Sequence, residues 1–150
     1  IVTLMSGTRY KDFQFDKILV DAPCSGTGTI RKSLKTLRIW NPSMLRKISN
    51  EQFRLAENAF LNLKPGGVMV YSTCSLEPEE NEAVVTRILN RFDNAKVEKV
   101  NFPGLKIGTS VMEFEGVKYH EEVKDSVRIW PQDNDTEGFF VCRIKKLLDE

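Results

Sequence analysis

The chain of 150 residues is long enough for one domain with a hydrophobic core, and its hydrophobic and charged shares, 41% and 29%, are ordinary for a globular protein. The net charge of +1 excludes a general electrostatic attraction to nucleic acid, so any site for a polyanion must come from local clustering of charge. No apolar stretch approaches the roughly 20 residues that a membrane span needs, and no signal peptide is visible.

Strands and helices are expected to alternate over the first two thirds of the chain. Residues 1–5 are predicted to form a strand, and we expect the chain to be a piece of a larger protein because it begins inside that strand. Residues 17–22 and 67–73 are continuous apolar runs, which are typical of parallel strands covered on both faces. The alternation predicts an α/β fold with a largely parallel sheet and helices on its faces.

Two helices are predicted between and after these strands. A helix around residues 50–63 is indicated by apolar residues that recur with a period of 3.6. A second helix is expected from about 78 to 92, with Pro78 at its first position. Acidic side chains suit the positive end of a helix dipole, so four glutamates are interpreted as dipole complements rather than catalysts. They are Glu77, Glu79, Glu80 and Glu82.

The last third of the chain has a different character. Residues 96–101 are predicted to form a strand, and a glycine-containing irregular stretch follows from 103 to 117. Two short apolar runs, 126–130 and 139–144, are joined by a polar turn. This pattern predicts an antiparallel hairpin that adds an antiparallel edge to the sheet.

Three cysteines are present, and two of them come directly after a predicted strand. Cys24 and Cys74 are each followed by serine, and the carboxyl ends of strands are where open α/β sheets bind ligands. A helix start after Cys74 is expected to lower the pKa of its thiol and favour the reactive thiolate. An inert buried thiol remains the alternative for Cys24. We interpret Cys142, on one face of a strand, as core packing.

The odd number of cysteines and the absence of C-x-x-C spacing argue against a disulfide framework or a zinc knuckle. A reducing, cytoplasmic setting is therefore expected. Candidate metal ligands are too sparse to propose a metal site.

Several motifs together carry a resemblance to a known family. Asp-Ala-Pro-Cys-Ser-Gly-Thr-Gly (21–28), Leu-Lys-Pro-Gly-Gly (63–67) and Tyr-Ser-Thr-Cys-Ser (71–75), followed by Glu-Glu-Asn-Glu (79–82), closely resemble the Nol/Nop/Sun family of RNA cytosine-C5 methyltransferases. Arg-Ile-Trp-Pro (128–131) with Glu-Gly-Phe-Phe (137–140) is similar to that family's last motif. The resemblance implies a Rossmann-like class I methyltransferase sheet, of which residues 1–150 form the C-terminal portion of the catalytic domain.

The resemblance also implies roles for three residues. Cys74 matches the nucleophile, Cys24 matches a second cysteine that helps to release the product, and Asp21 matches an aspartate that contacts the target base. Adding a thiolate to C6 of cytosine gives C5 the electron density to attack an electrophilic methyl group. A carboxyl group at the N3 edge stabilises this adduct. The base must be unstacked, which single-stranded or looped RNA permits most cheaply.

The methyl donor implied by the resemblance is S-adenosylmethionine. The family's glycine-rich loop and its ribose-binding acid lie upstream of these motifs and are not found here, and Thr8 stands where many relatives have an aspartate near the adenine. We therefore expect the isolated chain to lack the N-terminal donor-binding part and to bind the donor weakly or not at all. The remaining donor contacts are expected from Asp21, Ala22 and Pro23.

Candidate RNA contacts lie in a basic segment that contains no acidic residue from 30 to 50. Arg31, Lys32, Lys35 and Arg38 suit phosphate contact, and Trp40 suits base stacking. The alternative is a solvated loop in which Trp40 packs on the core.

The sequence thus predicts an S-adenosylmethionine-dependent RNA cytosine-C5 methyltransferase that acts on tRNA, with rRNA as the alternative substrate. A DNA cytosine methyltransferase would make Cys24 the attacking residue and leave Cys74 unexplained. A catalytically silent RNA-binding or assembly module is disfavoured by the presence of both cysteines and Asp21. The predicted partners are RNA and the N-terminal part of the same protein, with no membrane.

Overall fold

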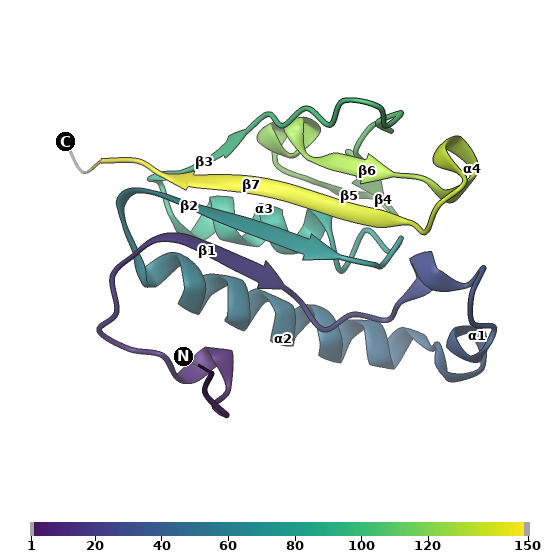
Figure 1. Cartoon of the computed structure of the whole chain (residues 1–150), viewed down its shortest axis with the longest axis horizontal. Helices are drawn as coiled ribbons and strands as arrows, with labels where there is room; N and C mark the ends of the chain where they lie inside the picture. The colour runs from purple at the N-terminus through teal and green to yellow at the C-terminus, as the bar shows by residue number, and fades with distance from the viewer. Residues whose placement is uncertain (1, 149–150) are drawn as a thin grey trace.

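Five strands form one mixed sheet in the computed structural model, which describes residues 2–148 (Figure 1). They are β1 (Phe15–Asp21), β2 (Leu63–Thr73), β3 (Ala95–Glu98), β6 (Val127–Ile129) and β7 (Phe139–Lys146). β1 pairs in parallel with β2, and β7 runs antiparallel to β2, β3 and β6. β7 alone therefore opposes the common direction of the other strands, which confirms a mostly parallel sheet with an antiparallel terminal hairpin.

The position of β7 in the sheet differs from the prediction. The β6–β7 hairpin is antiparallel, as expected, with Val127 opposite Val141. It does not add an outer edge, because β7 lies between β2 and β3 in the strand order. β3 and β6 pair end to end along one side of β7, while β2 pairs along the other. Phe140, Cys142 and Ile144 are fully buried on this strand, which explains its interior place.

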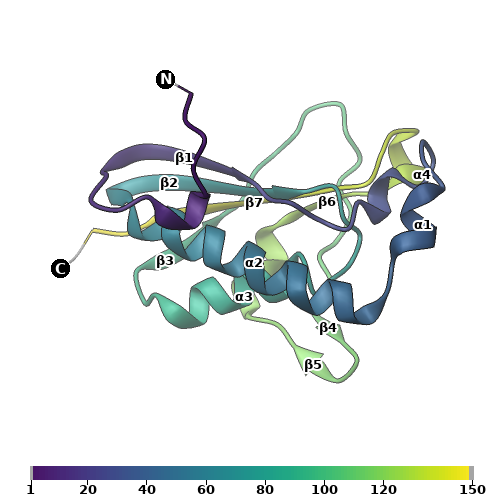
Figure 2. The ribbon, with the colours of Figure 1, turned by 90° about the horizontal axis from the view of Figure 1, so that it is seen from below.

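The two long helices lie on the same face of the sheet (Figure 2). They are α2 (Pro42–Leu61) and α3 (Glu82–Arg91). Strand residues that face them, such as Met69 and Tyr71, are 0% exposed. Leu19, on the opposite face of β1, is 68% exposed. The expectation that helices cover both faces is therefore wrong for residues 2–148, since the second face has no helix over it.

Helix α2 begins at Pro42 rather than near residue 50. Asn41 caps it by accepting a hydrogen bond from the Met44 backbone N–H at 2.9 Å, and Pro42 occupies the first turn, where its missing N–H costs nothing. The helix buries a stripe made of Leu45, Gln52, Ala56 and Phe60. The prediction of which face is buried was correct. The helix is longer than predicted, because the capping residue Asn41 and Pro42 start it earlier in the chain.

Helix α3 begins later than predicted. Residues 78–81 form a turn in which the Asn81 N–H donates to the Pro78 carbonyl at 3.2 Å, and regular helix starts at Glu82. Its apolar stripe is buried as expected: Val84, Val85, Ile88 and Leu89.

The remaining differences concern short segments. Residues 2–5 do not form the predicted strand and are followed by a 3-10 helix at Gly7–Arg9, while residue 1 lies outside the described residues. The predicted polar turn of the hairpin is a short helix. The short elements are α1 (Lys35–Ile39), α4 (Pro131–Asn134), β4 (Glu113–Phe114) and β5 (Val117–Lys118), with further 3-10 helices at Thr27–Thr29 and Glu121–Asp125. Within residues 2–148, no helix has both the length and the apolar character to cross a bilayer.

Candidate active site

The fold brings the Cys24 and Cys74 thiols together. β1 and β2 are adjacent parallel strands, with Asp21 opposite Ser72, so the loops that follow the two strands leave the same edge of the sheet. The two sulfur atoms lie 3.1 Å apart. Both cysteines are free and half-buried. Two residues that are 50 positions apart in the sequence are thus in direct contact in the fold.

The two thiols differ in proton affinity. The two sulfur atoms form a hydrogen bond in which either thiol can be the donor, and with Cys24 as the donor this contact is the main reason why the pKa of Cys74 is lowered to about 7. The same contact, together with burial, raises the pKa of Cys24. The carboxylates of Asp21 and Glu137 act in the opposite direction on Cys74 and raise its pKa. Cys74 is therefore the cysteine of the pair that ionises first, with a substantial thiolate fraction near neutral pH, while Cys24 stays protonated.

The cause of the lowered pKa of Cys74 is not the one expected from the sequence. Helix α3 begins only at Glu82, and residues 75–81 form a loop and a turn between Cys74 and that helix. A helix dipole acts over about one turn. The neighbouring thiol of Cys24 takes that role instead.

The three residues predicted to contact the donor lie at the end of β1. Asp21 is exposed, and its carboxylate accepts a hydrogen bond from the Ser72 hydroxyl at 3.0 Å. Ala22 is buried, and its backbone N–H donates to the Ser72 carbonyl at 3.0 Å. Pro23 is exposed. Asp21 and Pro23 are thus open to a ligand, whereas the Ala22 side chain faces the core.

The Cys24 loop is fastened to the Cys74 strand end through a glycine. The Gly28 N–H donates to the Cys74 carbonyl at 2.9 Å, and the Gly28 carbonyl accepts from the Gly138 N–H at 2.9 Å. A Cβ atom on Gly28 would lie 2.6 Å from the Cys74 carbonyl oxygen and 2.5 Å from that of Gly138. Only glycine permits this approach, because both obstacles are backbone atoms.

Of the acidic residues interpreted as dipole complements, Glu82 lies in the first turn of α3, as expected, whereas Glu80 lies before that helix and binds the cysteine loops instead. Glu80 and Glu82 are 0% exposed. The Glu80 carboxylate accepts hydrogen bonds from Ser25 and Ser75, the residues that follow the two cysteines. Glu77 is half-buried and accepts a hydrogen bond from the Trp40 indole at 3.0 Å.

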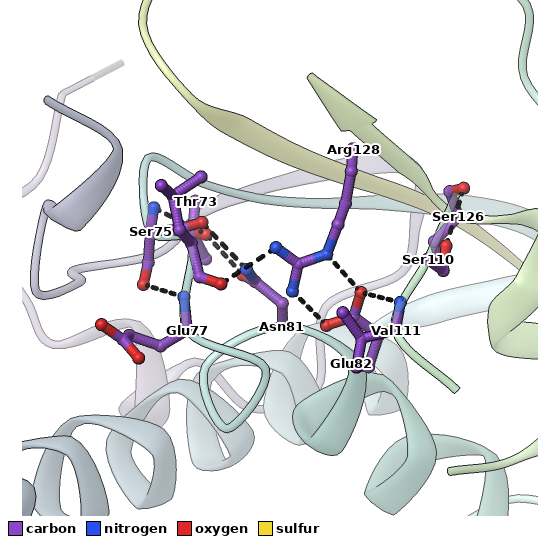
Figure 3. A network of polar contacts seen from close by, with 10 residues as sticks. Thr73, Ser75, Glu77, Asn81, Glu82, Ser110, Val111, Ser126 and Arg128 are labelled. Carbon is purple, nitrogen blue, oxygen red and sulfur yellow. Dashed lines mark hydrogen bonds and ion pairs between the residues drawn. The ribbon is translucent and has the colours of Figure 1, made fainter. Parts of the chain in front are cut away.

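Glu82 forms a buried ion pair with Arg128 (Figure 3). Two guanidinium nitrogens, Nε and Nη2, donate to the two carboxylate oxygens at 2.6 Å each. The third nitrogen, Nη1, donates to the Leu76 carbonyl at 2.9 Å. Arg128 therefore joins β6 to α3 and to the loop that follows Cys74. Arg128 belongs to the Arg-Ile-Trp-Pro motif, but its pairing with Glu82 joins residues 46 apart, and no local sequence pattern marks such a partner.

The predicted RNA-binding residues are all exposed, but two of them have acidic partners. Arg31 forms an ion pair with Asp135, and Lys32 forms one with Glu137, each at 2.6 Å. Lys35 and Arg38 lie on α1. Trp40 is 39% exposed, so it is neither fully packed nor free in solvent. Ion pairs at such exposed positions are weak and can exchange for phosphate contacts.

An apolar groove of about 750 Å³ lies along β1 and beside α2. Ile18, Leu19 and Val20 line it, and Asp21 is its sole acidic residue within the described part of the chain. S-adenosylmethionine has a charged amino acid moiety, a ribose and an adenine. The groove fits this donor only in part, because it offers an apolar wall and one carboxylate and has no second acid for the ribose.

The third cysteine has a structural place. Cys142 is 0% exposed in β7, and burial raises its pKa to about 12. The prediction that it packs in the core is confirmed.

The sheet, with β7 as its antiparallel strand, defines a Rossmann-like methyltransferase fold. Solved structures agree: a methyltransferase homolog protein from Pyrococcus horikoshii matches with a TM-score of 0.77 at 38% identity, covering 91% of this chain and 40% of that chain. NSun6 from the same organism, solved with SFG, an S-adenosylmethionine analogue, matches with a TM-score of 0.75 at 27% identity, covering 99% and 34%.

Residues 3–145 match the family model described as 16S rRNA methyltransferase RsmB/F. The chain belongs to this RsmB/F (Nol/Nop/Sun) family, as its motifs predicted. It is 48% identical over 147 residues to a tRNA (cytosine(49)-C(5))-methyltransferase of Pyrococcus abyssi, covering 97% of this chain and 47% of the relative. It is 45% identical over 134 residues to the ribosomal RNA small subunit methyltransferase F of Vibrio campbellii, covering 89% and 26%. The chain thus spans less than half of the length of these relatives.

Proposed function

We propose that this chain is the catalytic part of an S-adenosylmethionine-dependent RNA cytosine-C5 methyltransferase, with tRNA as its substrate. The observation that carries the proposal is the contact between two free thiols of unequal proton affinity, 3.1 Å apart at the carboxyl edge of parallel strands. Family membership supports the reaction class. The 48% identity to a tRNA cytosine methyltransferase over nearly the whole chain supports tRNA.

Cys74 is the nucleophile in this proposal. Its lowered pKa, about 7, supplies thiolate at neutral pH, and the thiolate adds to C6 of the target cytosine. The Cys24 thiol remains protonated, so it does not compete for the base. The same inequality disfavours a mechanism of the DNA methyltransferase type, in which Cys24 would attack.

Asp21 holds the target base. Its carboxylate is exposed, lies near Cys74 and accepts a hydrogen bond from Ser72, which restricts its orientation. A carboxyl group at the N3 edge of cytosine that is protonated, or that shares a proton with N3, stabilises the negative charge that develops on the ring when the thiolate adds to C6.

S-adenosylmethionine, when bound, supplies an electrophilic methyl group to C5. Asp21, Pro23 and the Ala22 backbone form the wall of this chain that would face it. After the C5 proton passes to solvent, the electron pair of the C5–H bond restores the C5–C6 double bond, the C6–S bond breaks and Cys74 leaves as a thiolate. The S–H group of Cys24 stabilises that leaving thiolate by the same hydrogen bond that lowers its pKa in the free protein.

We propose that the donor-binding part of the catalytic domain lies in a preceding segment of the same protein. The chain covers less than half of its relatives, and the groove along β1 lacks a ribose-binding acid in the described residues. The three free cysteines support a cytoplasmic place of action, where thiols stay reduced.

A covalent trap tests the proposal. RNA that contains 5-fluorocytosine cannot lose a proton from C5, so the enzyme–RNA adduct accumulates. The full-length protein, S-adenosylmethionine and labelled tRNA are incubated, and the adduct is measured on a denaturing gel. We expect an adduct with the wild type and with Cys24→Ala, and none with Cys74→Ala.

The other outcomes are equally informative. Loss of the adduct only in Cys24→Ala would make Cys24 the attacking residue. The absence of any adduct in the wild type would favour a silent RNA-binding module. A parallel incubation with 16S rRNA separates the two substrates, because the family description and the Vibrio campbellii relative support rRNA as the alternative.

A further inference from the structure

A single buried carboxylate connects the two cysteine loops. Glu80 is 0% exposed, and its Oε2 atom accepts hydrogen bonds from the Ser25 backbone N–H and the Gln52 side-chain amide, both at 2.9 Å. Its Oε1 atom accepts from the Ser75 hydroxyl at 2.8 Å and from the Ser25 hydroxyl. Ser25 and Ser75 immediately follow Cys24 and Cys74. Four donors thus fill the acceptor positions that a carboxylate offers.

Gln52 extends this connection to the other side of Cys24. Its amide also donates to the Pro23 carbonyl at 2.8 Å, and its side chain is 0% exposed. The backbone is therefore held at residue 23 by Gln52 and at residue 25 by Glu80. Cys24 lies between these two fixed points, and both of them depend on the same carboxylate–amide pair.

The backbone of residue 80 is itself fixed to the sheet. The Tyr71 hydroxyl donates to the Glu80 carbonyl at 2.6 Å, and Tyr71 is fully buried on β2. The adjacent Asn81 donates to the Ser75 carbonyl at 2.9 Å and accepts from the Thr73 hydroxyl at 2.6 Å (Figure 3). Glu80 is thus a rigid point from which both loops can be located.

We propose that Glu80 is a positioning residue that sets the contact between the Cys24 and Cys74 sulfur atoms. It touches neither sulfur and acts through Ser25 and Ser75. All four hydrogen bonds to its carboxyl oxygens come from neutral groups on the two cysteine loops and α2, so its contacts hold those groups in place. A short contact of 3.1 Å between thiols on separate loops requires such a fixed spacer, because small loop movements would lengthen it. This inference rests on the proposed function, in which the two thiols work as a pair.

The consequence is measurable without RNA or methyl donor. In the full-length protein, the alkylation rate of Cys74 by iodoacetamide is followed against pH by mass spectrometry. Asp21 and Glu137 are the carboxylates that raise the pKa of Cys74, and neither is changed in the variants. We expect Glu80→Ala to move the midpoint of the curve of Cys74 alkylation rate against pH upward by about one pH unit. This shift corresponds to a tenfold loss of Cys74 thiolate at pH values below the midpoint.

Two further variants define the role. Glu80→Gln is expected to restore the wild-type midpoint, because its amide oxygen can accept from Ser25 and Gln52 while its amide group donates to the two hydroxyls. A group that acts by transferring a proton would not be rescued in this way. The neighbouring, half-buried Glu79 is the matched control, since no hydrogen bond joins it to either serine in the described structure. Glu79→Ala is expected to leave the midpoint unchanged.

A double variant shows whether Glu80 acts through the thiol pair. In a Cys24→Ala background, Glu80→Ala is expected to have no further effect on the midpoint. A midpoint unchanged in Glu80→Ala, or one shifted equally in the Cys24→Ala background, would overturn the inference. If Glu80→Ala does not fold, Ser25→Ala decides: a shift in the same direction supports the inference and an unchanged midpoint overturns it.

The trap with 5-fluorocytosine RNA separates this inference from the proposed function. With ordinary RNA and Glu80→Ala, we expect kcat to fall about tenfold while the KM for RNA stays within about twofold, and with the trap we expect slower formation of the adduct. The outcome could also be that Glu80→Ala shifts the midpoint of Cys74 alkylation as expected while the wild-type protein forms no adduct with the RNA. That result would contradict the methyltransferase proposal but would still support the positioning role of Glu80.

Discussion

The hydrogen bond between Cys24 and Cys74 is the contact on which the chemistry of single residues depends. It lowers the pKa of Cys74 and raises that of Cys24, although both cysteines follow a strand and precede a serine. The contact between the two sulfur atoms is the main cause of both pKa shifts, so the difference arises from the pairing of the two thiols.

Removing the donor should therefore weaken the nucleophile. Cys24→Ala is expected to raise the pKa of Cys74 from about 7 toward the ordinary value of 9.0, because the main cause of the lowering is lost while the carboxylates of Asp21 and Glu137 still oppose the thiolate. Alkylation of Cys74 should then require higher pH, so its rate at pH 7 falls. The rate is measured on the Cys74 peptide by mass spectrometry between pH 5 and pH 10.

Cys142→Ala is the control for this experiment. Cys142 is buried in β7, and its thiol makes no hydrogen bond to the pair in the described structure. Its removal should leave the midpoint of Cys74 in place. A midpoint near 7 in the Cys24→Ala protein would show that another group lowers the pKa of Cys74.

At the level of elements, Arg128 holds three parts of the molecule together. It lies on β6, pairs with Glu82 at the start of α3 and donates to the Leu76 carbonyl after Cys74 (Figure 3). Glu82 also accepts from the Val111 N–H at 3.0 Å, which adds the irregular segment before β4. A substitution that removes this ion pair is therefore expected to disturb the contacts of several elements at once.

Breaking this pair should destabilise the fold strongly. Arg128→Met is expected to cost about 3–5 kcal/mol, because Glu82 would remain as an unpaired buried charge. The free energy of unfolding is measured by urea denaturation of the full-length protein. The double variant Arg128→Met/Glu82→Gln should recover part of the loss, since it leaves no unpaired charge.

Arg91, which lies on α3 like Glu82, provides the comparison. It pairs with Glu57 at 3.3 Å, but its side chain is 66% exposed. Arg91→Met should change the free energy of unfolding by less than about 1 kcal/mol, as is usual for exposed pairs. Equal losses at Arg91 and Arg128 would mean that burial of the pair with Glu82 contributes nothing.

At the level of the whole molecule, the sheet has one covered face and one open face. α2 and α3 cover the first (Figure 2), whereas Leu19 on the open face is 68% exposed and lines the groove along β1. β1 is also the last strand in the sheet order, so it pairs on one side only within the described residues. The exposed Leu19 and the unpaired side of β1 fit the proposal that a preceding part of the protein packs there.

A charge at Leu19 tests that packing. Leu19→Glu is expected to leave the melting temperature of the isolated chain unchanged, because the side chain is already in solvent. In the full-length protein it should lower the melting temperature by several degrees, since an unpaired charge would be buried. Both are measured by differential scanning calorimetry. The same small effect in both proteins would contradict the proposed packing.

Much of the fold and of the candidate site follows from local sequence. The apolar run before Cys24 and the one before Cys74 identify two parallel strands, and the helical period of Phe53, Ala56 and Phe60 identifies α2. Such patterns depend on neighbouring residues only, so they can be interpreted without coordinates. The motif around each cysteine likewise indicates an edge of the sheet where chemistry occurs.

Only the tertiary structure decided which residues hold the two thiols and how they differ. Glu82 and Arg128 are 46 residues apart, Ser25 and Glu80 are 55 apart, and no local period marks such partners. The interior place of β7 also depended on pairing with β2 and β3, which hydrophobic pattern does not encode. The sequence determined that two thiols lie at one edge. Long-range pairing decided that they touch, and this contact lowers the pKa of Cys74 and raises that of Cys24.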